Sequence, residues 1–369
     1  MSYVAETLRH IDDLASPQRV ASPFEFWPAP LFYAPVAAYW AWQALRYRSV
    51  TLPSIANPLM EFGGLCGESK IDLFESMSPE GRKWLAPYVS IERGPQAGLA
   101  EDLARLLDLA KEAGLAFPLV AKPDIGCHGA GVQLVHDAEE LRRYLAAFPS
   151  GARVLLQFLV QCEGEAGIFY VRRPAERTGQ IFSMTLKFFP QVTGDGTSTL
   201  KKLILEDPRA GRAPHLYLGR HAARLNWVPA RGERVRLVFA GNHCKGAAFR
   251  DGRDLITPAL TERVDWLART IPGFHFGRFD VRFSSLAELR AGHGFTAIEF
   301  NGGGSEAIHI WDPDMQLTQA YRDLFRQVHL LFEIGASHRA RGYVPDSIPA
   351  LARSWLRERM LKHSYPMTQ

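Results

Sequence analysis

The sequence predicts an α+β protein, and three observations support this class. Segments with the alternating period of β-strands mostly come in neighbouring pairs joined by turns, which is the pattern of antiparallel hairpins. Amphipathic helical segments lie beside these hairpins and do not alternate strictly with strands, as a doubly wound parallel sheet would require. The 369 residues suffice for two or three domains, each with its own hydrophobic core.

The part of the chain between residues 100 and 160 combines helices with short strands. Leucines at helical spacing predict helices, and short alternating or apolar runs predict strands. Asp137 and Glu140 form a capping pattern that begins one of these helices. The predicted elements are a helix over 101–113 closed by Gly114, a helix after Asp137, and strands over 119–122, 132–135 and 153–159.

The second half is predicted to be built mainly from hairpins. Two helices follow them, and Gly335 is expected to end the second helix. The predicted hairpin strands are 168–172 with 181–188, and 235–239 with 246–249 around a turn at 240–242. Two further strands are predicted over 278–282 and 297–301. The predicted helices cover 261–270 and 315–332.

Four regions follow from this order of elements. They are an N-terminal region over 1–95 that is a candidate for substrate binding, a smaller α+β unit over 96–162, a larger α+β unit over 163–345, and a basic helix over 346–369. The N-terminal region is rich in proline and aromatic residues, so its secondary structure is hard to read. Its segment 27–45 is apolar but interrupted by prolines, which favours a buried or interfacial segment over a membrane span. A peripheral membrane contact stays open.

Composition narrows the classes of function. The chain is 47% hydrophobic and 22% charged, which is ordinary for a globular protein, and its net charge of +4 gives no reason to expect nucleic acid binding. The four cysteines lie far apart, so neither a zinc site nor a disulfide framework is expected. No secretory signal is apparent at the N-terminus, and a cytoplasmic location is expected. A homodimer is left open.

The strands near 280 and 300 carry the most informative polar residues. Side chains two residues apart on a strand share a face, so Arg278, Asp280 and Arg282 point together, as do Glu299 and Asn301. If the two strands pair, carboxylate and amide oxygens meet guanidinium groups on one surface. This combination suits Mg²⁺ and phosphate. The alternative is a pair of surface strands with solvated charges.

A second candidate for phosphate binding lies earlier in the chain. Lys122 ends an apolar strand directly before the glycine-rich loop, which contains Gly126, Gly129 and Gly131. A lysine in this position can reach a nucleotide phosphate, and the N–H groups of the loop can close over it. The loop is not a Walker A sequence, because no Lys-Ser/Thr follows its last glycine. It does not match a Rossmann fingerprint either, because a strand follows it.

Together these segments resemble the ATP-grasp superfamily over roughly residues 100–335. The resemblance rests on Val120-Ala121-Lys122-Pro123, the glycine loop, Leu155–Leu159, Gly164-Glu165, Arg278-x-Asp280 and Ile298-Glu299-Phe300-Asn301. Carboxylate–amine ligases such as D-alanine–D-alanine ligase are similar in motif layout. The segment 192–199 also resembles a loop of peptide-polymer ligases such as cyanophycin synthetase. The resemblance implies an ATP-grasp fold, in which two α+β subdomains hold the nucleotide between them.

The resemblance also implies roles for individual residues. Lys122 and the loop glycines Gly129 and Gly131 would contact ATP phosphates. The backbone of the segment from Gln157 through Leu159 and Val160 would read adenine, and Glu165 would hold the ribose, with Glu163 as an alternative. The implied metal ligands for Mg²⁺ are Asp280, Glu299 and Asn301, and the implied catalytic residues are Arg278, Lys187 and Gly303.

Several functions remain open from the sequence. The resemblance implies an ATP-dependent ligase that joins a small-molecule carboxylate to an amine through an acylphosphate. A kinase acting on a hydroxyl and a non-catalytic nucleotide-binding module are the alternatives. Substrates could be selected by Arg46, Arg48, Glu61, Glu68 and Lys70, and a further phosphate contact could come from Arg93 or Lys111. His309 is expected to be a packed histidine rather than a ligand.

Overall fold

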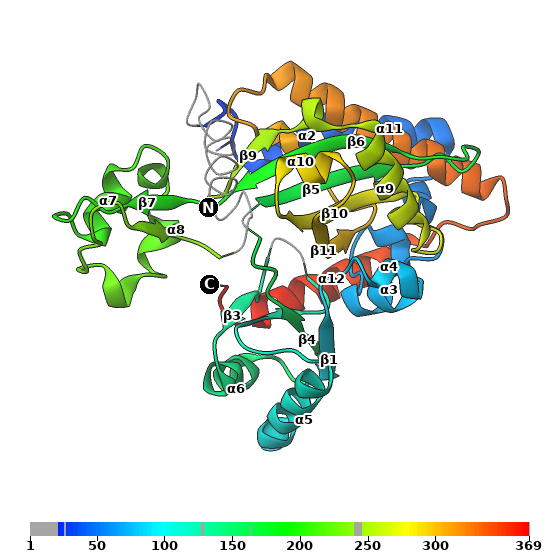
Figure 1. The fold of residues 1–369 in the computed structure, drawn as a ribbon. Helices are drawn as coiled ribbons and strands as arrows, with labels where there is room; N and C mark the ends of the chain where they lie inside the picture. The colour runs from blue at the N-terminus through cyan, green and yellow to red at the C-terminus, as the bar shows by residue number, and fades with distance from the viewer. Residues whose placement is uncertain (1–20, 26, 127–128, 163, 240–245, 369) are drawn as a thin grey trace.

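The structure is a computed structural model that describes residues 21–368, except 26, 127–128, 163 and 240–245. Two antiparallel sheets form the framework, with the smaller sheet below the larger one in Figure 1 and helix α12 running between them. The α+β class predicted from the sequence is therefore confirmed.

The smaller sheet has the strand order β1-β4-β2-β3. Its strands are β1 (Tyr88–Glu92), β2 (Leu119–Pro123), β3 (Gln133–Val135) and β4 (Arg153–Phe158). Helices α5 (Leu99–Glu112) and α6 (Ala138–Ala147) supply Leu106, Leu141 and Leu145 to a core that also contains Val154 and Leu156 of the sheet. The other face of the sheet is directed to the larger unit. As predicted, Asp137 caps α6, since its carboxylate accepts the Glu140 N–H at 2.8 Å.

The larger sheet has the order β11-β10-β5-β6-β9. Its strands are β5 (Gly164–Val171), β6 (Gln180–Phe188), β9 (Ala248–Asp251), β10 (Phe276–Phe283) and β11 (Phe295–Asn301). One face packs on α3 (Lys70–Ser76), α9 (Pro258–Arg269) and α10 (Leu286–Arg290). On the opposite face, α11 (Leu317–Arg339) covers Phe169 and Phe276, while α2 (Ala29–Tyr47) packs outside α11. The charged ends of β5, β6 and β10 lie beyond this helical cover.

A small additional unit projects from the larger sheet between β6 and β9, at the left of Figure 1. It contains β7 (Gln191–Thr193), α7 (Leu200–Glu206), α8 (His215–Leu218) and β8 (Arg234–Arg236), around its own cluster of buried apolar residues. The other α-helices of the described residues are α4 (Pro79–Arg82) and α12 (Ile348–Ser364).

Two local predictions are wrong. Strand β8 pairs with β7 and strand β9 pairs with β6, so residues 235–239 and 246–249 do not form a hairpin; their predicted turn lies largely outside the described residues. Gly335 does not end a helix, because α11 continues to Arg339. An added Cβ at Gly335 would come within 2.5 Å of the Leu52 carbonyl oxygen, so this glycine permits close packing instead.

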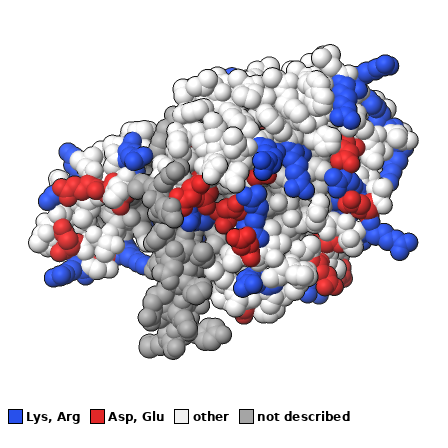
Figure 2. Space-filling model, turned by 90° about the horizontal axis from the view of Figure 1, so that it is seen from above, with Lys and Arg blue, Asp and Glu red and all other residues white. Residues whose placement is uncertain are grey.

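The N-terminal region is more helical than its composition suggests. Residues 29–47 form α2, with Pro30 in the first turn, where proline is tolerated, and Pro35 inside the helix. Strand β1 also lies before residue 96, so the smaller sheet begins earlier than the predicted boundary. Among the described helices, none is long and apolar enough to span a membrane. Figure 2 shows basic and acidic side chains interspersed on the face seen from above.

Candidate active site

A cavity of about 540 Å³ lies between the two sheets. Its walls come from both sheets and from the segments around residues 25–33, 64–68 and 304–311. The predicted site residues that line it are Lys122, Gly129, Gln157, Leu159, Val160, Glu165, Lys187, Arg278, Asp280, Glu299 and Asn301. Gly131 and Gly303 are not among the described lining residues.

Strands β10 and β11 pair as the sequence predicts. In their antiparallel register Asp280 lies opposite Glu299, and Arg278 lies opposite Asn301. The alternate residues Phe279 and Val281 are buried in the core on the other face. Gly167 of β5 is paired with Asp280, and an added Cβ there would meet the Asp280 carboxylate at 3.2 Å. The glycine therefore leaves room for the charged side chains.

The charged groups of the larger sheet form a buried network. Lys187 Nζ lies 3.1 Å from Glu165 and 3.0 Å from Asp280. Arg278 contacts both carboxylate oxygens of Asp280, at 3.0 and 3.1 Å, and Arg282 contacts Glu165 at 2.9 Å. Burial alone would raise the pKa of Asp280, but Arg278 and Lys187 outweigh it and lower this pKa to about 2. The Asp280 carboxylate is thus held ionised.

Glu299 is compensated from a different direction. The Lys70 ammonium group lies 3.4 Å from the Glu299 carboxylate and also donates to the Gly126 carbonyl at 2.7 Å. Lys70 therefore contacts the glycine loop, and it is not among the described residues that line the cavity. Burial opposes protonation of Lys70, but Glu299 and Glu68 outweigh this and raise its pKa. Asn301 lies beside Asp280, with 3.4 Å between its amide nitrogen and a carboxylate oxygen. Two carboxylates and an amide on adjacent strands are a donor set that fits Mg²⁺.

Lys122 reaches the same place from the smaller sheet. Its Nζ donates to the Ile298 carbonyl of β11 at 2.9 Å, so it spans the boundary between the two sheets. Burial lowers its pKa to about 8, against the opposing attraction of Glu299, Asp280 and Glu165. A lysine at this position is available as a point charge for an anion entering the cavity.

The residues predicted to bind adenine and ribose line the cavity, but the side chains of Gln157 and Glu165 already bond to other groups of the protein. The Gln157 side chain is buried and donates to the Ala86 carbonyl at 3.1 Å. Both oxygens of Glu165 accept from cations, as described above. Its role toward a ribose therefore stays a prediction. The alternative Glu163 lies outside the described residues.

The glycine loop is fastened by the C-terminal segment. The Thr368 hydroxyl donates to the Gly129 carbonyl at 2.8 Å and accepts the Gly131 N–H at 3.1 Å. Tyr365 donates to the Ile125 carbonyl at 2.7 Å. The Gly131 amide is therefore occupied within the protein rather than directed at the cavity. Sequence reasoning missed this contact, because nothing local to either segment indicates that the other lies beside it.

The glycine triplet does not offer its amides to a ligand in this structure. Gly302 N–H is bonded to the Glu68 carboxylate at 3.0 Å, Gly303 N–H to the Gly63 carbonyl at 2.9 Å, and Gly304 N–H to the Gly64 carbonyl at 2.6 Å. The Gly303 amide is thus already bonded within the protein, and the catalytic role implied for this residue stays a prediction. The amides of the triplet are occupied because two glycine-rich loops approach each other closely. An added Cβ at Gly64 would lie 2.6 Å from the Gly302 Cα.

The far end of the cavity is acidic and aromatic, which sequence reasoning largely missed. Glu306 accepts from the Tyr33 hydroxyl at 2.7 Å and from Trp311 Nε1 at 2.8 Å. Burial raises the pKa of Glu68 to about 8. Arg278 donates to the Glu306 carbonyl at 3.0 Å and so connects this end to the metal-type ligands. Outside the two sheets, the described carboxylates that line the cavity are Glu25, Glu68, Glu306 and Glu358.

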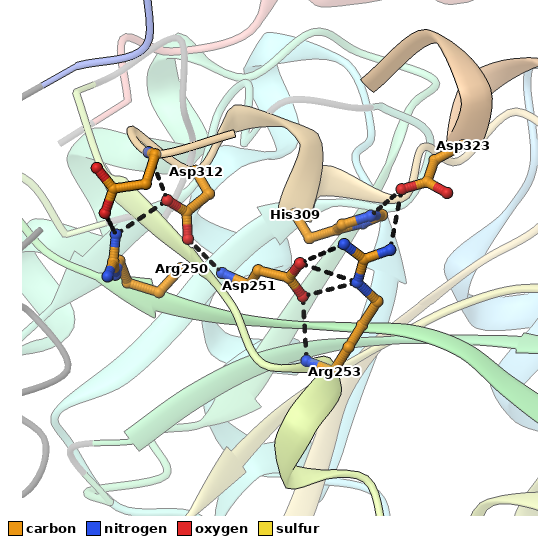
Figure 3. Close-up of polar contacts among 7 residues, drawn as sticks. Arg250, Asp251, Arg253, His309, Asp312 and Asp323 are labelled. Atoms are coloured by element: carbon orange, nitrogen blue, oxygen red, sulfur yellow. Dashed lines mark hydrogen bonds and ion pairs between the residues drawn. The ribbon is translucent and has the colours of Figure 1, made fainter. Parts of the chain in front are cut away.

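A further polar network supports this wall and is drawn in Figure 3. Arg253 bridges Asp251 and Asp323, and His309 Nε2 lies 2.8 Å from Asp323. Arg250 and the Asp251 N–H both contact Asp312. The network ties β9 and α11 to the turn η8 (Ile308–Trp311), whose ends Ile308 and Trp311 line the cavity. His309 is fully buried, in agreement with its expected packing role.

The structure has the two α+β units and the intervening cavity that an ATP-grasp fold implies. Solved structures that match it include a bifunctional glutathione synthetase from Pasteurella multocida, with a TM-score of 0.34, 17% identity, and coverage of 70% of this chain and 36% of that chain. The chain thus spans about a third of the length of that protein. No family model matches the sequence, and a comparison with curated proteins gives no match.

Two D-alanine–D-alanine ligases also match. The enzyme from Bacillus anthracis has a TM-score of 0.42 and 13% identity, with 77% of this chain and 72% of that chain covered. The enzyme from Coxiella burnetii has a TM-score of 0.39 and 10% identity, with 82% and 64% covered. Similarity at this level does not define an activity, so the reaction has to be inferred from the site.

Proposed function

We propose that this protein is an ATP-dependent ligase that joins a carboxylate to an amine, with Mg-ATP as its nucleotide. One observation carries the proposal: Lys122 of the smaller sheet meets the cations and carboxylates of β6, β10 and β11 in one cavity. Binding a nucleotide triphosphate needs cationic groups for its phosphates and hard oxygen ligands for its metal. The cavity lining supplies both the cationic groups and the oxygen ligands.

The proposed reaction assigns a role to each charged group. Lys122, Lys187 and Arg278 hold the phosphate oxygens while a substrate carboxylate attacks the γ-phosphorus and ADP leaves. Asp280, Glu299 and Asn301 would hold Mg²⁺, which neutralises phosphate charge when it is bound. The amine then attacks the acylphosphate carbonyl, loses a proton and displaces free phosphate. Arg278 is the donor proposed for the oxyanion, since the Gly303 amide is occupied.

The acidic end of the cavity favours an amine over a neutral hydroxyl as the second substrate. Glu306 and Glu358 bring carboxylates to the cavity lining, and Trp311 and Phe32 bring apolar surface to it. A protonated amine with an apolar portion matches both features. The kinase alternative lacks a comparable supporting feature.

The test is a product assay with Mg-ATP and pairs of amino acids or dipeptides. A ligase forms ADP and free phosphate in equal amounts, and only when both an acid and an amine are present. ADP without free phosphate would identify a kinase instead. Calorimetric binding of Mg-ATP without ADP formation in any mixture would identify a nucleotide-binding module.

A further inference from the structure

Helix α12 has one face packed on the protein and another that is exposed. Inward, Leu361 packs with Tyr365 against the core of the smaller unit, and Glu358 accepts the Gly67 N–H at 2.9 Å. Outward, four large apolar side chains are accessible. They are Ile348, Trp355, Leu356 and Met360, with exposed fractions of 61%, 49%, 50% and 67%. This set, with the neighbouring arginines described next, is called the outer face of α12.

Arginines border Leu356 and Met360 on both sides, and Trp355 lies beyond Arg359. At 100° per residue, Leu356 and Met360 lie above one another on the helix, with Arg353 and Arg357 along one edge and Arg359 along the other. All three arginines are exposed. Arg359 lies over the Trp355 ring at 5.4 Å, and Arg353 donates to the Pro349 carbonyl at 3.3 Å, so neither of these contacts uses a carboxylate. The helix's one acidic residue, Glu358, points inward.

The apolar surface continues beyond the helix. A groove between α12 and the end of α2 is lined by Trp40, Val50, Leu351 and Trp355, among others, and its accessible lining is mostly apolar. Several exposed apolar residues on one helix, with cations beside them, indicate an interaction surface rather than isolated surface side chains.

We propose that the outer face of α12 binds the surface of an anionic lipid bilayer. Leucine, methionine and tryptophan side chains can enter the interfacial layer, while arginines on both edges reach lipid phosphates. Tryptophan favours this layer because its ring is apolar and its N–H is polar. A protein partner would need carboxylates placed against arginines on two opposite edges of an apolar stripe, whereas an anionic bilayer supplies negative charge on every side.

Membrane binding through this face would bring the cavity close to the bilayer. Glu358 lines the cavity from the inner side of the same helix, and the segment after α12 fastens the glycine loop through Thr368. The proposal does not depend on the reaction proposed above, because lipid binding can be measured without substrates.

The first test is co-sedimentation of the full-length protein with vesicles. Phosphatidylcholine vesicles containing phosphatidylglycerol should bind it, and pure phosphatidylcholine vesicles should bind it much more weakly. The double variant Leu356→Glu/Met360→Glu should lose at least about tenfold in affinity for the anionic vesicles. A matched control, Leu205→Glu/Val228→Glu, changes two exposed apolar residues of the projecting unit and should bind as the unaltered protein does.

The second test changes charge instead of apolar surface. Arg353→Glu/Arg357→Glu should weaken binding to anionic vesicles by roughly fivefold per arginine, and added salt should shrink this difference. Arg105→Glu/Arg290→Glu, on exposed positions of α5 and α10, is the control. Equal binding to both vesicle types, or equal losses in variants and controls, would overturn the proposal. So would α12 variants that bind vesicles normally but dissociate a dimer in sedimentation equilibrium, since the face would then join two copies.

Discussion

The two sheets present very different charge patterns to the cavity they share. The larger sheet contributes a network in which Lys187 and Arg278 neutralise Asp280, and Arg282 neutralises Glu165. Among the described lining residues of the smaller unit, Lys122 is the charged one. The first wall is an array of fixed, mutually compensated charges, and the second is a single buried cation surrounded by apolar and backbone groups.

This difference separates two kinds of electrostatic behaviour. In the network, Asp280 has a pKa of about 2, and Asp280 and Glu165 overcome the effect of burial to raise the pKa of Lys187. Asp280 and Lys187 therefore keep their charges across the neutral range. Lys122 has few compensating contacts, and burial brings its pKa to about 8. The smaller unit is therefore the side of the site that is sensitive to pH, and the larger unit supplies constant charge.

Removing a carboxylate from the network should have the largest effect. Asp280→Asn and Glu299→Gln should each lower turnover of Mg-ATP by at least about 100-fold, because both remove a proposed metal ligand. Asp280→Asn should also cost about 3–5 kcal/mol of unfolding free energy, because Lys187 and Arg278 lose their buried partner. Glu299 is partly exposed, so its variant should stay closer to the unaltered stability.

Steady-state ADP release and urea unfolding measure the two quantities. Asp254→Asn, which removes an exposed carboxylate next to the sheet, is the control and should leave both unchanged. Full turnover in Glu299→Gln would contradict the metal-ligand assignment whatever happens to Asp280→Asn.

The next effect concerns Arg278, which joins the network to the acidic end of the cavity. Arg278→Ala should lower kcat by about 100-fold with a smaller change in ATP affinity, since its proposed role is to stabilise charge that develops during the reaction. Arg278→Lys keeps the charge but not the two-point contact with Asp280, and should recover only part of the loss. Equal kcat in the alanine variant and the unaltered protein would remove Arg278 from the mechanism.

The network was largely predictable from the sequence, because it depends on local strand period. Alternation alone places Arg278, Asp280 and Arg282 on one face, and the register of β10 with β11 then brings Glu299 opposite Asp280. The position of Lys122 was predictable for a similar reason, since it ends an apolar strand before a glycine loop. The alternation of residues along a strand does not reveal whether Lys122 meets the charged residues of β10 and β11, because that contact depends on how the two sheets pack.

Contacts between distant segments were not predictable. The pairing of β9 with β6 skips the whole projecting unit, so the nearest strand in sequence was the wrong partner. The amides of the glycine triplet are bonded to a loop more than 200 residues away, and Thr368 reaches the glycine loop from the C-terminal segment. Such contacts follow from tertiary packing, and a single sequence carries no local signal for them.

The pKa of Lys122 predicts a change of intermediate size in ATP affinity with pH. Lys122 loses its proton as the pH rises through about 8, so ATP should bind about tenfold more weakly for each further unit. Stability should change in the opposite direction. The folded-state pKa of Lys122 is below its value of 10.5 in an unfolded chain, so deprotonation contributes added stability between pH 8 and 10.5.

Calorimetric ATP titrations from pH 7 to 10, paired with unfolding curves, separate the two effects. Lys122→Arg keeps its charge over this range and should flatten the pH dependence of binding. If the variant and the unaltered protein keep the same slope, another group, such as Glu68, is responsible.

The smallest expected effect concerns the glycine loop of the smaller unit. This loop is held by hydrogen bonds to Thr368, whereas the charged groups of the larger unit lie on strands. Thr368→Val preserves side-chain shape but removes the hydroxyl that bonds Gly129 and Gly131. Two hydrogen bonds of ordinary strength are lost, so the dissociation constant for ATP should rise roughly threefold to tenfold, with little change in kcat at saturating ATP. Thr178→Val, an exposed residue between β5 and β6, is the control. A fall in kcat without a change in ATP affinity would mean that the C-terminal segment acts on the reaction itself, and the assignment of the glycine loop to nucleotide binding would fail.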